Sequence, residues 1–132
     1  MPQVKAGKKF DLDLDFGLSV ERRICSLIER MGHLCEVKAD RKAGQTGNLV
    51  FEIRCRGKPS GLAATSSHFW AQAIVDEHGF IQSVLLVPTA ALKARIKRLY
   101  KQGKVRRVVG GDDKASEMLL VSLRDAEALL HD

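Results

Sequence analysis

The 132-residue sequence lacks several patterns that would place it in a class at once. Its three cysteines form no C-x-x-C pair and have no histidine at ligand spacing, which argues against a disulfide framework and a structural zinc site. It also has no apolar run near the ~18 residues that a membrane helix needs, and no apolar stretch follows its basic N-terminus as in a signal peptide. We therefore expect a cytoplasmic protein without a membrane partner.

The sequence also lacks internal repeats, low-complexity segments and a recognisable interdomain linker. With 45% hydrophobic residues, it is long enough to close one core and too short for two ordinary domains. We expect an N-terminal arm over residues 1–16 and a single domain over residues 17–132.

Acidic residues are absent from one long segment. Lys and Arg outnumber Asp and Glu by 22 to 16, and the segment KARIKRLYKQGKVRR, residues 93–107, has eight basic residues and no acid. Such a segment is typical of a surface that binds a polyanion, although a solvated helix face has the same composition. Nucleic acid is therefore a candidate partner.

Hydrophobic periodicity predicts an α/β protein with a mixed sheet. Helical spacing of apolar residues runs from Val20 to Met31, and Gly32 is placed to end that helix. Period-two segments at 33–40 and 48–55 predict two consecutive strands, which we expect to pair. The remaining predicted elements are a hairpin over 70–88, a helix over 89–100, strands over 104–109 and 117–123, and a helix over 124–130.

Three carboxylates are candidates for a metal site. Glu21 falls at the rim of the first helix's apolar stripe, and Asp40 and Glu52 lie on the two consecutive strands. Carboxylates that converge at a strand pair can hold Mg²⁺ or Mn²⁺, which lowers the pKa of a bound water and neutralises charge on a phosphate. The alternatives are ordinary ones, since Glu21 is also favourable in an exposed first turn and Glu52 on a solvent-facing strand.

The order of these elements resembles the PD-(D/E)XK nuclease superfamily, whose core has a helix with a Glu, then strands with an Asp and an E-x-K. GLSVE, residues 17–21, is similar to the first-helix motif of archaeal-type Holliday junction resolvases. EVKAD, TGNLVFE, RGKPSG, LLVPTAAL and VVGGDDKAS resemble a family of small bacteriophage proteins with that fold. The resemblance covers residues 17–125 and implies a restriction-endonuclease-like core, a central mixed β-sheet flanked by helices.

This resemblance implies roles for individual residues. Glu21 would be the helix acid, Asp40 the metal-binding acid and Glu52 the acid of E-x-K. The sequence departs from the motif at Arg54, because a guanidinium binds phosphate better than it positions a water. Lys38, two residues before Asp40, or Lys58 in the following turn could supply the missing ammonium. A literal E-x-K also occurs at residues 36–38, which we rank below Glu52 because no Asp precedes it on a strand.

Two basic regions are candidates for nucleic-acid contacts. The loop after the strand at 48–55 offers Arg56, Lys58 and Ser60 to phosphates. Trp70 could stack on a splayed base, but we favour a place in the core. The helix over 89–100 and its end offer Lys93, Lys97, Arg98 and Lys101.

The sequence thus predicts a phage-type, Mg²⁺- or Mn²⁺-dependent DNA endonuclease. The resemblance implies branched or recombination intermediates as substrates, the host cytoplasm as its compartment if phage-encoded, and a homodimer as in resolvases. The alternative is a nucleic-acid-binding protein that retains the fold and has lost catalysis, with Arg54 as the reason.

Overall fold

The computed structural model describes the backbone of residues 9–30 and 34–132, and their side chains except those of 9–17, 21, 28 and 112. The protein is mixed α/β with two sheets. The elements, in chain order, are α1 (Lys9–Arg30), β1 (Cys35–Asp40), α2 (Ala43–Thr46), β2 (Asn48–Cys55), β3 (Lys58–Pro59), η2 (Gly61–Ala63), β4 (Phe69–Val75), β5 (Ile81–Pro88), α3 (Thr89–Lys101), β6 (Val105–Gly110), η3 (Asp112–Lys114), β7 (Ser116–Ser122) and η4 (Leu123–Leu129).

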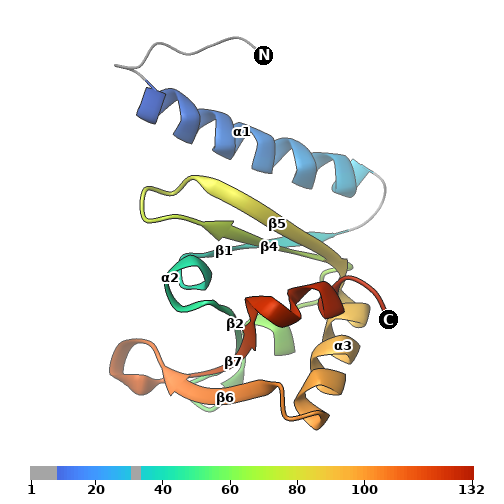
Figure 1. The fold of residues 1–132 in the computed structure, drawn as a ribbon. Helices are drawn as coiled ribbons and strands as arrows, with labels where there is room; N and C mark the ends of the chain where they lie inside the picture. Colours follow the sequence, from blue (N-terminus) through green and yellow to red (C-terminus); the bar gives the residue numbers. More distant parts are fainter. Residues whose placement is uncertain (1–8, 31–33) are drawn as a thin grey trace.

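The first sheet has the order β1-β4-β5, with β1 parallel to β4 and β4 antiparallel to β5. The second sheet is antiparallel, with the order β3-β2-β7-β6. In Figure 1, α1 lies along the side of the first sheet that faces away from the second, and α3 stands beside both sheets. The expectation of one central mixed sheet was therefore wrong.

The consecutive strands β1 and β2, which we expected to pair, belong to different sheets. A side chain connects them in place of a backbone ladder: at the end of β1 the Asp40 carboxylate accepts the backbone N–H of Val50. This N–H is therefore bonded to a side chain instead of a neighbouring backbone carbonyl. The short α2 and the left-handed Gly47 then turn β2 toward β7.

The first helix begins at Lys9, so residues 9–16, expected to form an arm, are helical. The apolar spacing does extend upstream, because Phe10 and Leu14 lie eight and four residues before Leu18. Acidic residues in DLDLD are also favourable near a helix N-terminus. Leu27, predicted to be buried, is 53% exposed.

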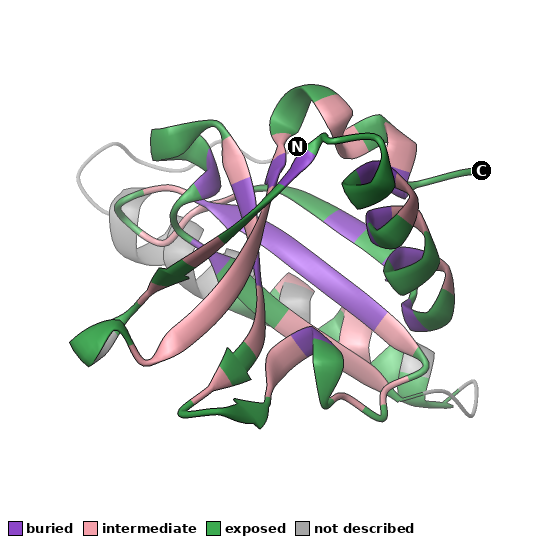
Figure 2. Ribbon diagram, turned by 90° about the horizontal axis from the view of Figure 1, so that it is seen from below, coloured by how far each residue is buried: buried purple, intermediate pink, exposed green. Residues whose placement is uncertain are grey.

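The core lies between the two sheets and α3. Strand β4 is buried along almost its whole length (Figure 2). Its inward side chains, Trp70 among them, belong to one hydrophobic cluster. The cluster also includes Phe51 and Val121 of the second sheet and Leu92 of α3. On this inner face of the first sheet, β5 contributes the buried Leu85 and Val87, and β1 carries Glu36, Lys38 and Asp40.

Strand β2 contains a β-bulge, beyond which its side chains alternate in the opposite sense between the two faces of the sheet. The register with β7 pairs Glu52 with Met118 but Arg54 with Glu117, the preceding residue of β7. Directly opposed residues share a face and consecutive residues do not, so Glu52 and Arg54 lie on opposite faces. The alternation predicted from the sequence, which put both on one face, was wrong beyond Glu52.

Candidate functional site

Asp40 joins the two sheets through its buried carboxylate, and the residue is only 5% exposed. Its Oδ1 accepts the backbone N–H groups of Lys42 at 2.9 Å and Ala43 at 3.0 Å. Its Oδ2 accepts the N–H of Val50 at 2.9 Å and the side-chain amide of Gln72 at 2.8 Å. An ionised carboxylate can accept about four hydrogen bonds, so these four donors fill all the acceptor positions of Asp40.

Gln72 is the second buried polar residue of the site, at 1% exposure on β4. Its Nε2 donates to Asp40 and, at 3.0 Å, to the backbone carbonyl of Val50. Its Oε1 accepts the indole N–H of Trp70 at 2.8 Å. Trp70 itself is 2% exposed, which confirms the core placement and excludes base stacking by this residue.

Glu52 reaches the same region from β2. Its Oε1 accepts the hydroxyl of Ser116, the first residue of β7, at 2.8 Å, so the start of β7 orients this carboxylate. Behind it lies Gly61, with φ of +52°, and a Cβ at that position would overlap the backbone carbonyl of Glu52. Glycine is thus required at residue 61 both for its backbone angle and for the close approach.

A pocket of about 380 Å³ brings three of the predicted residues together, although they come from two sheets. Asp40 and Glu52 supply carboxylates to it, and Lys38 supplies an ammonium. The complete lining is Lys38, Ala39, Asp40, Arg41, Lys42, Val50, Glu52, Gly61, Trp70 and Gln72.

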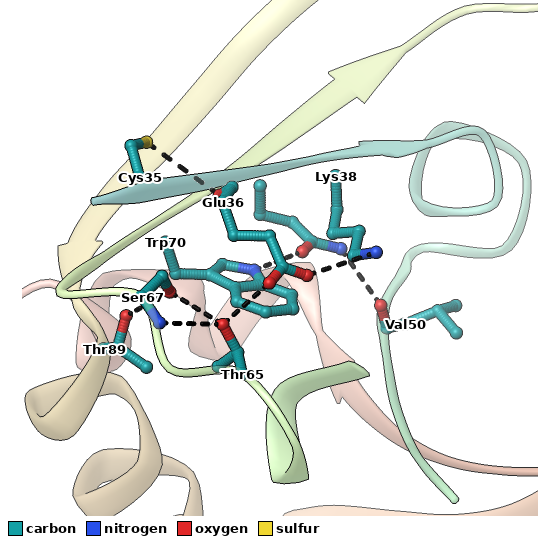
Figure 3. Close-up of polar contacts among 9 residues, drawn as sticks. Cys35, Glu36, Lys38, Val50, Thr65, Ser67, Trp70 and Thr89 are labelled. Carbon is teal, nitrogen blue, oxygen red and sulfur yellow. Dashed lines mark hydrogen bonds and ion pairs between the residues drawn. The ribbon is translucent and has the colours of Figure 1, made fainter. Parts of the chain in front are cut away.

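Lys38 is held beside the pocket by an ion pair. Its Nζ lies 3.2 Å from Glu36 Oε2, and Glu36 Oε1 accepts the Thr65 hydroxyl at 2.7 Å (Figure 3). Thr65 in turn lies 2.9 Å from the Ser67 hydroxyl, which is 3.1 Å from that of Thr89. In the literal E-x-K of residues 36–38, the two charged side chains therefore form an ion pair, and Glu36 orients Lys38.

Arg54 does not line this pocket, because the bulge turns it to the face of Glu117. There Arg107 donates hydrogen bonds to Glu117, and these bonds, with a smaller contribution from the charge of Arg54, lower the pKa of the Glu117 carboxyl. Arg54 therefore acts on the charge of Glu117 and lies outside the pocket that Glu52 lines.

The loop after β2, whose Arg56, Lys58 and Ser60 were predicted to contact phosphates, lies outside the pocket. Arg56 and Gly57 have successive positive φ values and close the tight hairpin from β2 to β3. Arg56 and Lys58 are exposed at this hairpin and do not line the pocket. The Ser60 hydroxyl is buried and has no hydrogen-bond partner among the described residues, so it is not presented to solvent.

The basic residues of α3 have different surroundings, since the two arginines contact η4 and two of the lysines line a groove. Arg98 donates to the backbone carbonyl of Ala128 at 3.2 Å, and Arg95 donates to that of Leu129 at 3.0 Å. These guanidinium groups fasten η4 to α3, so Arg98 has a structural use that the sequence did not predict. Lys93 and Lys97 border a separate groove, whereas Lys101 is exposed in the last turn.

The side chain of Glu21, the third predicted acid, lies outside the described residues, although its backbone is part of α1. Among the described side chains, no group of three or more His, Cys, Asp or Glu residues is arranged to hold a metal ion. No helix in the described part of the chain is long and apolar enough to span a membrane.

Sequence reasoning missed two residues that shape the site, Gln72 and Ser116. Gln72 did give a signal, because it is the one polar residue in the segment WAQAIV. Ser116 gave none, since its contact with Glu52 joins residues 64 positions apart. It also assigns a role to the end of the GGDDKAS loop, which had none from sequence alone.

Comparison of the chain with protein-family models, with curated proteins and with solved structures gives no match. The site is therefore interpreted from its own residues.

Proposed function

We propose that this protein is a metal-dependent DNA endonuclease, and that its centre is the pocket lined by Lys38, Asp40 and Glu52. One observation carries the proposal: residues singled out from the sequence for phosphodiester hydrolysis meet in one pocket although they come from different sheets. A positively charged protein gathers the DNA, and the acids of the pocket recruit the cation.

The donor chemistry of the pocket fits Mg²⁺ or Mn²⁺ through Glu52. Its carboxylate is a hard oxygen donor, and only its Oε1 accepts a hydrogen bond from a described residue. Asp40 would join as a ligand only by giving up one of its four donors. A divalent cation bound there would lower the pKa of its water and neutralise charge on the phosphate.

The protein's own groups would orient the substrate. The Lys38 ammonium, fixed by Glu36, is placed to contact a phosphate oxygen at the pocket. Arg41 and Lys42 line the same pocket and add positive charge where the DNA backbone would lie. Glu52, oriented by Ser116, supplies the carboxylate on the other strand.

A non-catalytic DNA-binding protein is the second candidate, and the hydrogen bonding of Asp40 favours it. A carboxylate whose four positions accept N–H groups is a structural joint between β1, β2 and β4. In a binding protein of this kind, the basic side chains of the pocket would bind phosphate, and no metal ion would assist cleavage.

The experiment that separates the two candidates uses Glu52→Gln. The Gln side chain still accepts the Ser116 hydroxyl but loses the charge, so the fold is retained. Labelled linear, single-stranded, nicked and four-way-junction DNA are incubated with Mg²⁺, Mn²⁺ or EDTA. Endonuclease function predicts metal-dependent cleavage that Glu52→Gln reduces about 100-fold or more, while the matched exposed variant Glu77→Gln has no effect.

Tight, salt-dependent binding without cleavage would replace the endonuclease by the binding protein. Absence of both would overturn both candidates. Asp40→Ala is unsuitable as the first variant, because it removes the joint between the sheets and confounds activity with folding.

The proposal includes a homodimer, as resolvases form. Strand β5 is an edge of the first sheet, and its Val84 and Leu86 are 41% and 42% exposed. Leu18 and Leu27 of α1, which lies over this sheet, are also exposed (Figure 1). Light scattering on the wild type and on Val84→Lys with Leu86→Lys tests it: a dimer that the double variant converts to monomer is expected, and a monomeric wild type contradicts it.

A further inference from the structure

A second hollow, of about 440 Å³, lies between α3 and the second sheet. Its apolar lining comes from Ile53 of β2, Leu62 of η2 and Leu119 of β7. The α3 side contributes Lys93 and Lys97. We call this hollow the α3 groove. Asp40 and Glu52, the acidic residues of the first pocket, do not line it.

The α3 groove combines an apolar floor with positive charge. Lys93 and Lys97 are exposed and form no ion pair with any described residue. Arg107 also lines it and is paired with Glu117, whose negative charge is thereby balanced. Tyr100, 51% exposed, adds an aromatic ring to the lining. An apolar, flat group attached to an anion is complementary to this surface.

The groove and the proposed active pocket lie back to back across one thin element. Glu52 lines the pocket and the next residue, Ile53, lines the groove. Likewise Gly61 lines the pocket and Leu62 lines the groove. The two hollows therefore share β2 and η2 as a wall, and a strand of several nucleotides has to pass around this wall to occupy both.

We propose that the α3 groove binds an unpaired nucleobase of a DNA strand whose backbone lies at the Lys38–Asp40–Glu52 pocket. This inference rests on the proposed DNA function and specifies its substrate class: DNA with single-stranded nucleotides beside the reactive phosphate. A base in a duplex is stacked and paired and cannot enter an apolar groove, whereas an unpaired base can stack on Tyr100 while Lys93 and Lys97 contact the adjoining phosphates.

The test measures binding in EDTA, so that it does not depend on cleavage. Fluorescence anisotropy compares a labelled 12-nucleotide oligo(dT), an abasic chain of equal length and charge, and a duplex. We expect oligo(dT) to bind about tenfold more tightly than the abasic chain, which corresponds to the stacking of about one base. The duplex is expected to bind no more tightly than the abasic chain.

Two pairs of variants locate the effect. Ala63→Phe fills the groove without changing charge, and Ala64→Phe is the matched control at the neighbouring exposed residue outside it. Lys97→Gln removes a groove cation, and Arg124→Gln removes an exposed cation of η4 that lines neither hollow. We expect Ala63→Phe to abolish the preference for oligo(dT) over the abasic chain and Lys97→Gln to weaken both, with the controls unchanged.

The outcomes separate this inference from the function on which it rests. Equal binding of oligo(dT) and the abasic chain, or a preference that survives Ala63→Phe, overturns the groove as a base site while DNA binding stands. An acidic Leu- and Glu-containing peptide that binds in an Ala63-dependent manner, with oligo(dT) indifferent to Ala63→Phe, would make the groove a protein-docking site instead. No binding of any DNA overturns the inference together with the proposed function.

Discussion

Glu52 and Arg54, two residues apart on β2, point to opposite faces of the second sheet. The β-bulge between them pairs Glu52 with Met118 and Arg54 with Glu117. Glu52 consequently lines the proposed active pocket, whereas Arg54 lies near the Arg107–Glu117 ion pair. An arginine in the third place of the E-x-K motif therefore says little about whether the pocket is catalytic.

This relationship predicts that Arg54→Lys, which restores a literal E-x-K, does not raise cleavage. Lys38→Gln, in contrast, should reduce cleavage about 100-fold, because Lys38 supplies the ammonium of the pocket. Initial cleavage rates on the preferred DNA measure both. A gain with Arg54→Lys and no loss with Lys38→Gln would mean that the bulge does not exist in the working protein.

Asp40→Ala should destabilise the fold by about 3 kcal/mol or more. It leaves three backbone N–H groups and the Gln72 amide without their acceptor, and each buried unsatisfied donor costs about 1–3 kcal/mol. Urea unfolding measures the loss. Asp125→Ala, at a partly exposed position of η4, is the control; equal small losses in both would contradict a joint at Asp40.

Gly61→Ala should cost about 2–4 kcal/mol of unfolding free energy, because the Cβ overlaps the Glu52 backbone as well as meeting a positive φ. Gly57→Ala separates these two causes. Its φ is +78°, yet nothing lies within 4 Å of the added Cβ, so about 1–2 kcal/mol is expected. Equal losses would show that only the backbone angle matters at residue 61.

Ser60→Ala should leave stability unchanged or raise it by up to about 1 kcal/mol. The buried hydroxyl has no partner among the described residues, and removing an unsatisfied polar group is neutral or favourable. DNA affinity should also be unchanged, since the hydroxyl is not exposed. A clear loss of affinity would restore Ser60 as a phosphate contact.

Cys35 should react slowly with alkylating agents at pH 8. Burial, together with the neighbouring Cys25 thiol, raises the pKa of Cys35 to about 11. Because the thiolate is the reactive form, its alkylation should be more than about tenfold slower than that of a cysteine peptide. The rate should continue to rise up to about pH 11. Peptide mass spectrometry after timed alkylation follows this residue individually, and a rate plateau near pH 9 would contradict the shift.

The sequence by itself determined several local elements, among them β2 and α3, although α1 extends into the residues expected to form an arm. Period-two segments located β2 exactly at residues 48–55, and the apolar spacing of Leu92, Ile96 and Leu99 located α3. Asp40 and Glu52 were also named from sequence as carboxylates on consecutive strands, whereas Lys38 was named through the resemblance to the nuclease motif. These signals are local, since side-chain periodicity depends only on the backbone geometry of one element.

Only the tertiary structure decided how these elements combine. The Asp40 carboxylate joins the two sheets by accepting the N–H of Val50, and the face on which Arg54 lies depends on a bulge against β7. The orientation of Glu52 depends on Ser116, 64 residues away. In each case a backbone or side-chain group could form hydrogen bonds with several partners that are distant in the sequence. The periodicity of side chains along the chain does not indicate which partner is chosen.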